Sequence, residues 1–164
     1  SPDLSNPWFT QWSYDAAARL CYETKKAMPD KTVMVYYLGG INSWMPSVDG
    51  IEPGMFVDYA VADYGGTAAP MQGMTVKQCS GMSIELNRGS GDSSESTARS
   101  KKEAGYGYYM FFALGHTTSL VNDFDDYRFQ VGRCQSVARG LYDEELLMPE
   151  YYYKKNDATR YKLP

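Results

Sequence analysis

The sequence predicts an α/β fold built around a parallel sheet. The segment Gly105–Leu114, GYGYYMFFAL, is almost entirely apolar, which is typical of a strand buried on both faces. Patterns typical of helices precede it at Asp92–Ala104 and follow it at Asp123–Glu145. Strands that are joined by crossovers and covered on both faces belong to parallel sheets. Each predicted strand also ends at a glycine-rich or polar segment, which is where α/β barrels carry their chemistry.

The chain opens with a predicted loop at Ser1–Pro7 and a predicted helix at Trp8–Met28. Apolar residues at spacings of four and seven share one face of this helix, namely Trp8, Trp12, Ala16, Leu20 and Ala27. Lys25 and Lys26 lie in its last turn, where cations suit the helix dipole. Pro29 then ends the helix.

Two strands with a long loop between them come next. Lys31–Leu38, KTVMVYYL, is rich in β-branched and aromatic residues and stops at a glycine pair. Ile41–Gly54 reads as a loop that carries Trp44, and Met55–Tyr64, MFVDYAVADY, reads as the second strand. Alternation along that strand separates two faces, one with Phe56, Asp58, Ala60, Ala62 and Tyr64, the other with Val57, Tyr59, Val61 and Asp63.

The third strand is predicted at Cys79–Asn87, after a short helical turn at Thr75–Gln78. Asp92 and Glu95 have the spacing of a capping box and open the next helix. Gly105 is its expected C-terminal glycine. In the last helix a core stripe is formed by Val131, Cys134, Ala138 and Leu141. The tail Met148–Pro164 is predicted to be irregular.

Composition excludes some classes of function. The 164 residues correspond to one domain or part of a larger one. The net charge of −4 comes without a basic stripe, so no nucleic-acid surface is expected. No apolar run approaches the ~20 residues of a membrane span. Aromatic residues make up 15% of the chain, which suits either sugar binding or packing around a large sheet.

Neither a metal nor a cofactor is expected. Cys21, Cys79 and Cys134 are widely spaced and form no CxxC pair, so we interpret them as small buried side chains. His116 is the single histidine, which disfavours a histidine-rich metal site or a catalytic triad, and its polar surroundings suggest a solvent-facing position. The glycine pairs match no phosphate-binding motif.

Two strand ends resemble the second half of a family 18 glycoside hydrolase barrel, nearest to its endo-β-N-acetylglucosaminidase branch. GYGYYMFFAL resembles the eighth barrel strand, and VDYAVADYGG resembles the sixth. KTVMVYYLGG then corresponds to strand five and CSGMSIELN to strand seven. The resemblance implies a (β/α)8 TIM-barrel fold, of which residues 1–164 form the C-terminal half of one domain, a half-barrel. It also implies an N-terminal half as partner.

The family's catalytic signature, D-x-x-D-x-D-x-E, is absent from these residues. The acidic cluster of Asp123, Asp125 and Asp126 lacks the spacing and the final Glu, and it suits a helix N-terminus better. The resemblance therefore implies that the signature precedes Ser1. The expected activity is cleavage between the two core GlcNAc residues of N-glycans, by a retaining mechanism in which the substrate's acetamido oxygen is the nucleophile. Catalysis requires both halves of the barrel.

By resemblance, Tyr64 donates a hydrogen bond to the acetamido oxygen and stabilises the oxazolinium intermediate. A phenol suits this task because it donates without carrying charge at neutral pH. The structural alternative is a strand-end tyrosine whose hydroxyl reaches water.

Five further residues are candidates for substrate binding. Phe112 falls where chitinases have a tryptophan at the floor of the sugar pocket, although it is equally suited to a core. Asp63, Glu85 and Asn87 are polar residues near strand ends and are expected at the mouth of the barrel, where they bind sugar hydroxyls or form structural pairs. Trp44 either stacks on a sugar ring or covers a barrel edge.

Three other functions stay open. The first is that the chain is part of a chitinase-like hydrolase. The second is that it is part of a glycan-binding relative without catalysis, and the third is that it is a fragment with no separate function. The glycan substrate suggests an extracellular, periplasmic or cell-surface location.

Overall fold

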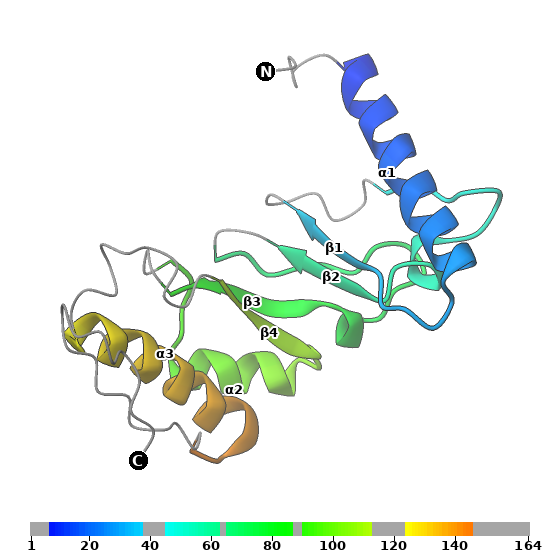
Figure 1. Cartoon of the computed structure of the whole chain (residues 1–164). Coiled ribbons are helices and arrows are strands. Elements are labelled where there is room, and N and C mark those ends of the chain that lie inside the picture. The colour runs from blue at the N-terminus through cyan, green and yellow to red at the C-terminus, as the bar shows by residue number, and fades with distance from the viewer. Residues whose placement is uncertain (1–6, 38–44, 63–64, 87–89, 113–123, 146–164) are drawn as a thin grey trace.

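The observed elements follow the predicted order. The computed structural model describes residues 7–37, 45–62, 65–86, 90–112 and 124–145 (Figure 1). The described elements are α1 (Pro7–Ala27), β1 (Met34–Tyr37), the 3-10 helix η1 (Pro53–Met55), β2 (Tyr59–Ala62), the 3-10 helix η2 (Val76–Gln78), β3 (Ser80–Glu85), α2 (Glu95–Glu103), β4 (Tyr108–Phe112) and α3 (Phe124–Tyr142). The α/β class is therefore confirmed for these residues.

The four described strands run parallel and lie side by side in chain order. β1 pairs with β2 and β3 pairs with β4, and a parallel bridge between Ala60 and Cys79 joins the two pairs. The register of β3 and β4 shifts between Ser80 and Ser83, which marks a bulge in β3. Because all four strands are parallel, their carboxyl ends meet at one edge of the sheet.

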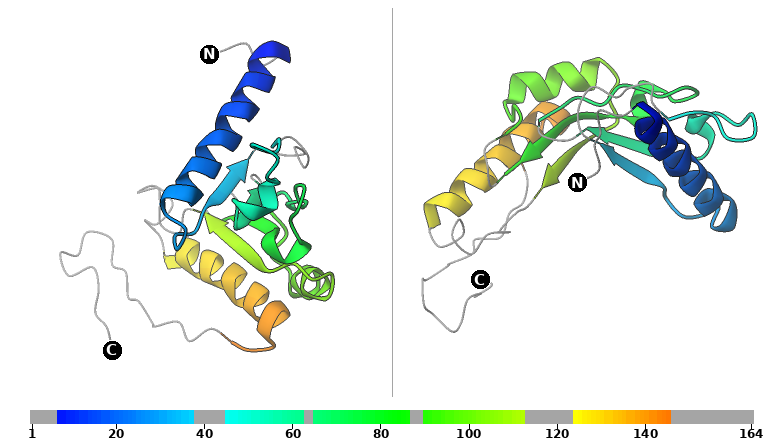
Figure 2. Two further views of the ribbon diagram at one scale, coloured as in Figure 1. Left: turned by 90° about the vertical axis from the view of Figure 1, so that its right-hand side faces the viewer. Right: turned by 90° about the horizontal axis from the view of Figure 1, so that it is seen from above.

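Helices cover one face of this sheet, which we call the outer face. Ala18 of α1 packs in one apolar cluster with Ala60, Ala62 and Cys79. In a second cluster Ala98 of α2 and Val137 of α3 pack with Met82, Ile84 and Leu86, which lie in or just after β3, and the partly buried Tyr109 of β4 packs against them. Figure 2 shows α1 beside β1 and β2, and the other two helices beside β3 and β4. Burial of these side chains is the main force that holds the helices on the strands.

The opposite face of the sheet, the inner face, carries large apolar side chains that the described residues leave partly exposed. Alternation and register place four such residues on it, with exposed fractions of 56% for Met34, 44% for Tyr36, 41% for Tyr59 and 43% for Phe112. The Tyr59 and Tyr108 rings also meet edge to face there, with centroids 5.2 Å apart. An apolar face of this kind usually marks a surface that another element covers.

The Gly-Tyr-Gly sequence that opens the fourth strand has a steric explanation. Gly105 follows α2 with φ of +87°, a left-handed conformation in which glycine avoids the penalty of a Cβ atom. Tyr106 packs against the first apolar cluster. Gly107 lies against η2, and a Cβ atom at Gly107 would stand 1.9 Å from the Lys77 carbonyl oxygen.

Several sequence-based predictions need correction. In α1 the residues that pack on the apolar cluster are Ala18, Cys21 and Tyr22, whereas Ala16, Leu20 and Ala27 of the predicted apolar face are exposed. β4 is not buried on both faces, because the described residues leave Phe111 38% and Phe112 43% exposed.

The second strand begins at Tyr59 rather than Met55, because Pro53 starts a 3-10 turn and its carbonyl accepts from the Val57 amide at 2.8 Å. The N-cap of α2 is Ser94, whose hydroxyl accepts from the Thr97 amide, so no Asp92–Glu95 capping box forms. All three cysteines were predicted to be buried, but Cys21 and Cys134 are half-buried and Cys79 is fully buried.

Asp58 joins three elements at the amino end of the sheet. Its carboxylate accepts from Lys25 Nζ of α1 at 2.9 Å and from the Val33 amide at 2.7 Å, next to β1. Burial raises the pKa of Asp58, but the Val33 amide and the Lys25 ammonium outweigh it and hold that pKa below its ordinary value. The ionised carboxylate is therefore the form that stabilises the fold.

Stability should fall when Asp58 becomes protonated. Because the native pKa lies below the unfolded one, the contribution is present above the unfolded pKa and is lost as pH falls through the native pKa. We expect Asp58→Asn to cost about 1 kcal/mol at neutral pH, after discounting for partial exposure, and to flatten the acid limb of a stability–pH profile from chemical denaturation.

Asp49 provides the matched control, because its pair with Arg19 at 2.7 Å is exposed. The effect of Asp49→Asn should vanish at high salt, whereas that of Asp58→Asn should persist. Equal salt sensitivity of the two variants would contradict the assigned role of Asp58.

Candidate functional site

Glu85 and Phe112 lie side by side at the carboxyl ends of β3 and β4. They are register partners, and the Leu86 amide donates to the Phe112 carbonyl oxygen at 3.1 Å. Ile84 and Leu86 pack against the helices on the outer face, so alternation places the Glu85 side chain on the inner face. Register partners in a parallel pair share a face, and the Phe112 side chain is therefore on the inner face too. The structure therefore brings these two candidates to one strand edge, and their roles stay predictions.

The Glu85 carboxylate is a buried acidic group, with 3% of the residue exposed. Two residues earlier on the same face, Ser83 is fully buried and its hydroxyl has no hydrogen-bond partner among the described residues. Burying a carboxylate beside polar groups at a strand end costs free energy unless partners compensate it. Such groups are suited to receive the hydroxyl groups of a sugar.

Partly exposed aromatic side chains share the inner face with this carboxylate. The ring of Phe112 is 43% exposed, so its apolar face is accessible from the inner side. Tyr36, in the carboxyl half of β1, is 44% exposed and shares that face. Sugar rings present C–H groups that pack well on aromatic faces. The sequence reasoning did not select Tyr36, although alternation within KTVMVYYL could have placed it on a face with Met34.

Arg133 of α3 is a second residue that sequence reasoning missed. Its guanidinium is buried and donates to the carbonyl oxygens of Glu85 and Ser90, each at 2.9 Å, and of Gly91. Its Nε donates to the Ser93 hydroxyl at 2.9 Å. Arg133 therefore ties α3 to the carboxyl end of β3. No local sequence signal marks it, because these carbonyl partners lie more than forty positions away in the chain.

The other predicted site residues lie outside the described residues. They are Trp44, Asp63, Tyr64 and Asn87, and their roles stay predictions. His116 and the tail Met148–Pro164 lie outside the description as well.

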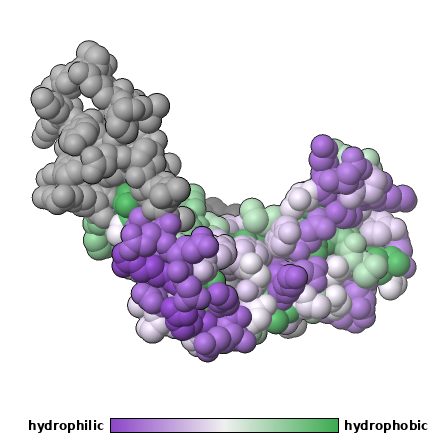
Figure 3. Space-filling view, turned by 90° about the horizontal axis from the view of Figure 1, so that it is seen from below, coloured by the Kyte–Doolittle hydropathy of each residue, from purple (hydrophilic) through white to green (hydrophobic). Residues whose placement is uncertain are grey.

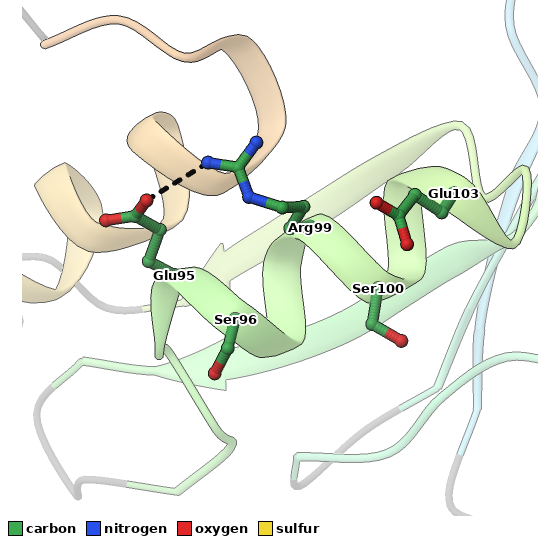
Figure 4. A pocket seen from close by; sticks show the side chains of 5 residues that line it. All are labelled: Glu95, Ser96, Arg99, Ser100 and Glu103. Atoms are coloured by element: carbon green, nitrogen blue, oxygen red, sulfur yellow. Dashed lines mark hydrogen bonds and ion pairs between the residues drawn. The ribbon is translucent and has the colours of Figure 1, made fainter.

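A hollow on the outer surface of α2 is not part of this site. Figure 4 shows the residues that line it, Glu95, Ser96, Arg99, Ser100 and Glu103. Arg99 is already paired there with Glu95 at 3.0 Å and with Asp143. The surface over α2 is strongly hydrophilic in Figure 3, as expected for the solvent-facing side of a helix. This hollow is also separated from Glu85 by the sheet.

Neither a metal cluster nor a membrane span is found in the described ranges. Within them no three His, Cys, Asp or Glu side chains gather closely enough to hold a metal ion. Each helix in the same ranges is too short or too polar for a membrane span.

Comparisons with known proteins relate the chain to glycan-cleaving enzymes. It is 35% identical over 151 residues to endo-beta-N-acetylglucosaminidase F1 of Elizabethkingia meningoseptica, covering 90% of this chain and 43% of that protein. Two crystal structures of Bacteroides thetaiotamicron EndoBT-3987 match all of the chain at 42% identity and a TM-score of 0.72, with 36% and 39% of those chains covered. One holds a Man5GlcNAc product and the other a Man9GlcNAc2Asn substrate. No family model matches. The chain spans less than half the length of these relatives.

Proposed function

Because this chain is a relative of the endo-β-N-acetylglucosaminidases over most of its length, we propose that it forms part of an enzyme that cleaves N-glycans between their two core GlcNAc residues. The observation that carries the proposal is the 42% identity, across the whole chain, to a protein solved with Man9GlcNAc2Asn bound. Identity at this level over one continuous α/β unit supports a shared activity better than fold alone.

In this proposal the chain supplies strands five to eight of a (β/α)8 barrel, as a half-barrel. Four parallel strands in chain order, with helices on one face, suit consecutive βα units of such a barrel. The partly exposed inner face supports it further, because the interior of a closed barrel is packed with side chains. The N-terminal half of the barrel is the proposed partner for this face.

The proposed mechanism divides the chemistry between the two halves. As in family 18 glycoside hydrolases, the substrate's acetamido oxygen attacks the anomeric carbon, and a glutamic acid outside these residues protonates the leaving oxygen. From this chain, Tyr64 stabilises the oxazolinium intermediate and Phe112 forms part of the pocket floor. Glu85 accepts hydrogen bonds from sugar hydroxyls, since its carboxylate faces the inner side beside the Phe112 ring.

The remaining candidates complete the proposed subsites. Asp63 and Asn87 bind sugar hydroxyls at the mouth of the barrel, and Trp44 stacks on a sugar ring. An N-glycan substrate favours an extracellular, periplasmic or cell-surface location for the protein.

The test is incubation of the full-length protein with a glycoprotein that carries high-mannose N-glycans. We expect mass spectrometry to find a released glycan ending in one GlcNAc and a protein that keeps the other. Cleavage of chitin oligosaccharides in place of the glycoprotein would indicate a chitinase-like enzyme. Glycan binding without release would indicate a lectin-like relative.

A further inference from the structure

Arg133 connects two successive βα units. It lies on α3, the helix after β4, yet its guanidinium contacts the carboxyl end of β3 and the segment Ser90–Ser93. The residue is only 8% exposed. Its hydrogen-bond partners within the described ranges are carbonyl and hydroxyl oxygens of this one region, so the side chain acts as a local brace.

The geometry of these bonds requires arginine. Nη1 donates to the Glu85 carbonyl, Nη2 to the Ser90 and Gly91 carbonyls, and Nε to the Ser93 hydroxyl. Three separate nitrogens are thus used, in directions that a planar guanidinium fork provides. A lysine ammonium can replace one of these branches but not all of them.

These bonds fix the backbone of Glu85 on both sides. Its amide donates to the Ser90 carbonyl at 3.1 Å, and its carbonyl accepts from Arg133 at 2.9 Å. The Ser90 carbonyl is itself held by Arg133. With both peptide groups anchored, the direction of the Glu85 Cα–Cβ bond is set, and with it the point on the inner face from which the carboxylate extends.

Burying the charged guanidinium of Arg133 costs electrostatic free energy. Burial lowers the pKa of the Arg133 guanidinium, against the opposing effects of Cys134 and Asp92. A buried cation bonded to neutral oxygens is an expensive way to hold a loop if only stability matters. An apolar contact from the same helix position would be cheaper, as Val137 provides one turn later.

We propose that Arg133 is a positioning residue of the glycan site, which acts by holding the Glu85 carboxylate beside the Phe112 ring where a sugar hydroxyl is bound. This inference rests on the proposed function. It assigns Arg133 no contact with the substrate.

Four variants of the full-length protein test the inference, assayed for glycan release well below their melting temperatures. Arg133→Met should lower kcat/KM about tenfold, mainly through KM, since it loosens a binding group rather than a reacting one. Arg133→Lys should recover part of that loss. In a Glu85→Gln background, Arg133→Met should add little, because both changes act through one carboxylate. Additive losses would overturn the inference.

Val137→Ala is the matched control, because Val137 is buried on the same helix in the outer-face apolar cluster and its side chain makes none of the hydrogen bonds that hold Glu85. It should lower the melting temperature and leave kcat/KM unchanged. An equal loss of kcat/KM in Val137→Ala and Arg133→Met would show that Arg133 acts through general stability, which overturns the inference.

Amide hydrogen exchange separates this inference from the proposed function. Arg133→Met should speed exchange at the Glu85 and Leu86 amides, which donate to the Ser90 and Phe112 carbonyls. Unchanged exchange there overturns the inference whether or not glycan is released. Faster exchange together with an inactive wild type overturns the proposed function and leaves the bracing role of Arg133 standing.

Discussion

Replacing Gly107 with alanine is expected to destabilise the fold severely. A Cβ atom at this position would lie 1.9 Å from the Lys77 carbonyl oxygen and 2.9 Å from its carbonyl carbon. These are backbone atoms, so no rotation of a side chain can relieve the overlap. Either η2 or the start of β4 must move.

Both alternatives break hydrogen bonds. η2 is held by the Gln78 amide to the Thr75 carbonyl and by the Cys79 amide to the Val76 carbonyl, each at 3.0 Å. At the start of β4 the Gly107 amide donates to the Cys79 carbonyl oxygen, and the Tyr108 hydroxyl donates to the Ala60 carbonyl oxygen at 2.7 Å. Overpacking in well-ordered structure typically costs about 1–3 kcal/mol, and we expect about 3 kcal/mol or more here.

The measurement is the free energy of unfolding of the full-length protein in denaturant. Gly132→Ala serves as a control with the same chemical change, because Gly132 lies inside α3 with no described atom within 4 Å of the position that an added methyl group would take. Alanine there should stabilise the helix by about 0.5–1 kcal/mol. Similar midpoints for Gly107→Ala and the wild type would refute the steric explanation of the Gly-Tyr-Gly sequence.

Some features of the fold could be predicted from local sequence and some could not. The existence of the four strands and the Cys134, Ala138 and Leu141 stripe of α3 were predictable, because β-branched and aromatic runs and helical periodicity are local signals. The start of β2 was placed too early, since Met55 and Phe56 look like strand residues while Pro53 commits them to a 3-10 turn. The strand propensity of Met55 and Phe56 is therefore outweighed by the turn that Pro53 begins.

The residues of the candidate site also divide into those that the sequence could identify and those that it could not. Glu85 was selected as a polar strand-end residue and Phe112 by resemblance to chitinases, and parallel register makes the two neighbours. Arg133 could not be selected, because an arginine on an amphipathic helix ordinarily faces water. Its importance comes from carbonyl groups that the fold brings to it from another βα unit. Contacts of this kind are set by tertiary structure and leave no periodic pattern.

Tyr64→Phe is expected to reduce glycan release by a factor of about 10²–10³, the usual loss when one hydrogen-bond donor to developing charge is removed. Only the hydroxyl is deleted, so the aromatic ring is kept. The role of Tyr64 comes from resemblance to family 18 enzymes. The described part of β2 ends at Ala62, at the same carboxyl edge of the sheet as Glu85 and Phe112.

A loss mainly in kcat would mark stabilisation of the intermediate, whereas a loss only in KM would mark ordinary binding. Tyr59→Phe is the control, since Tyr59 begins the same strand and meets Tyr108 through its ring. Its turnover should stay within about twofold of the wild type, as for a change away from the reacting atoms.

Asp63 is the competing candidate for this role, because the alternation of Tyr59 and Val61 on the inner face would place Asp63 on that face if the strand pattern continued. A larger loss of kcat in Asp63→Asn than in Tyr64→Phe would therefore transfer the stabilising role to Asp63.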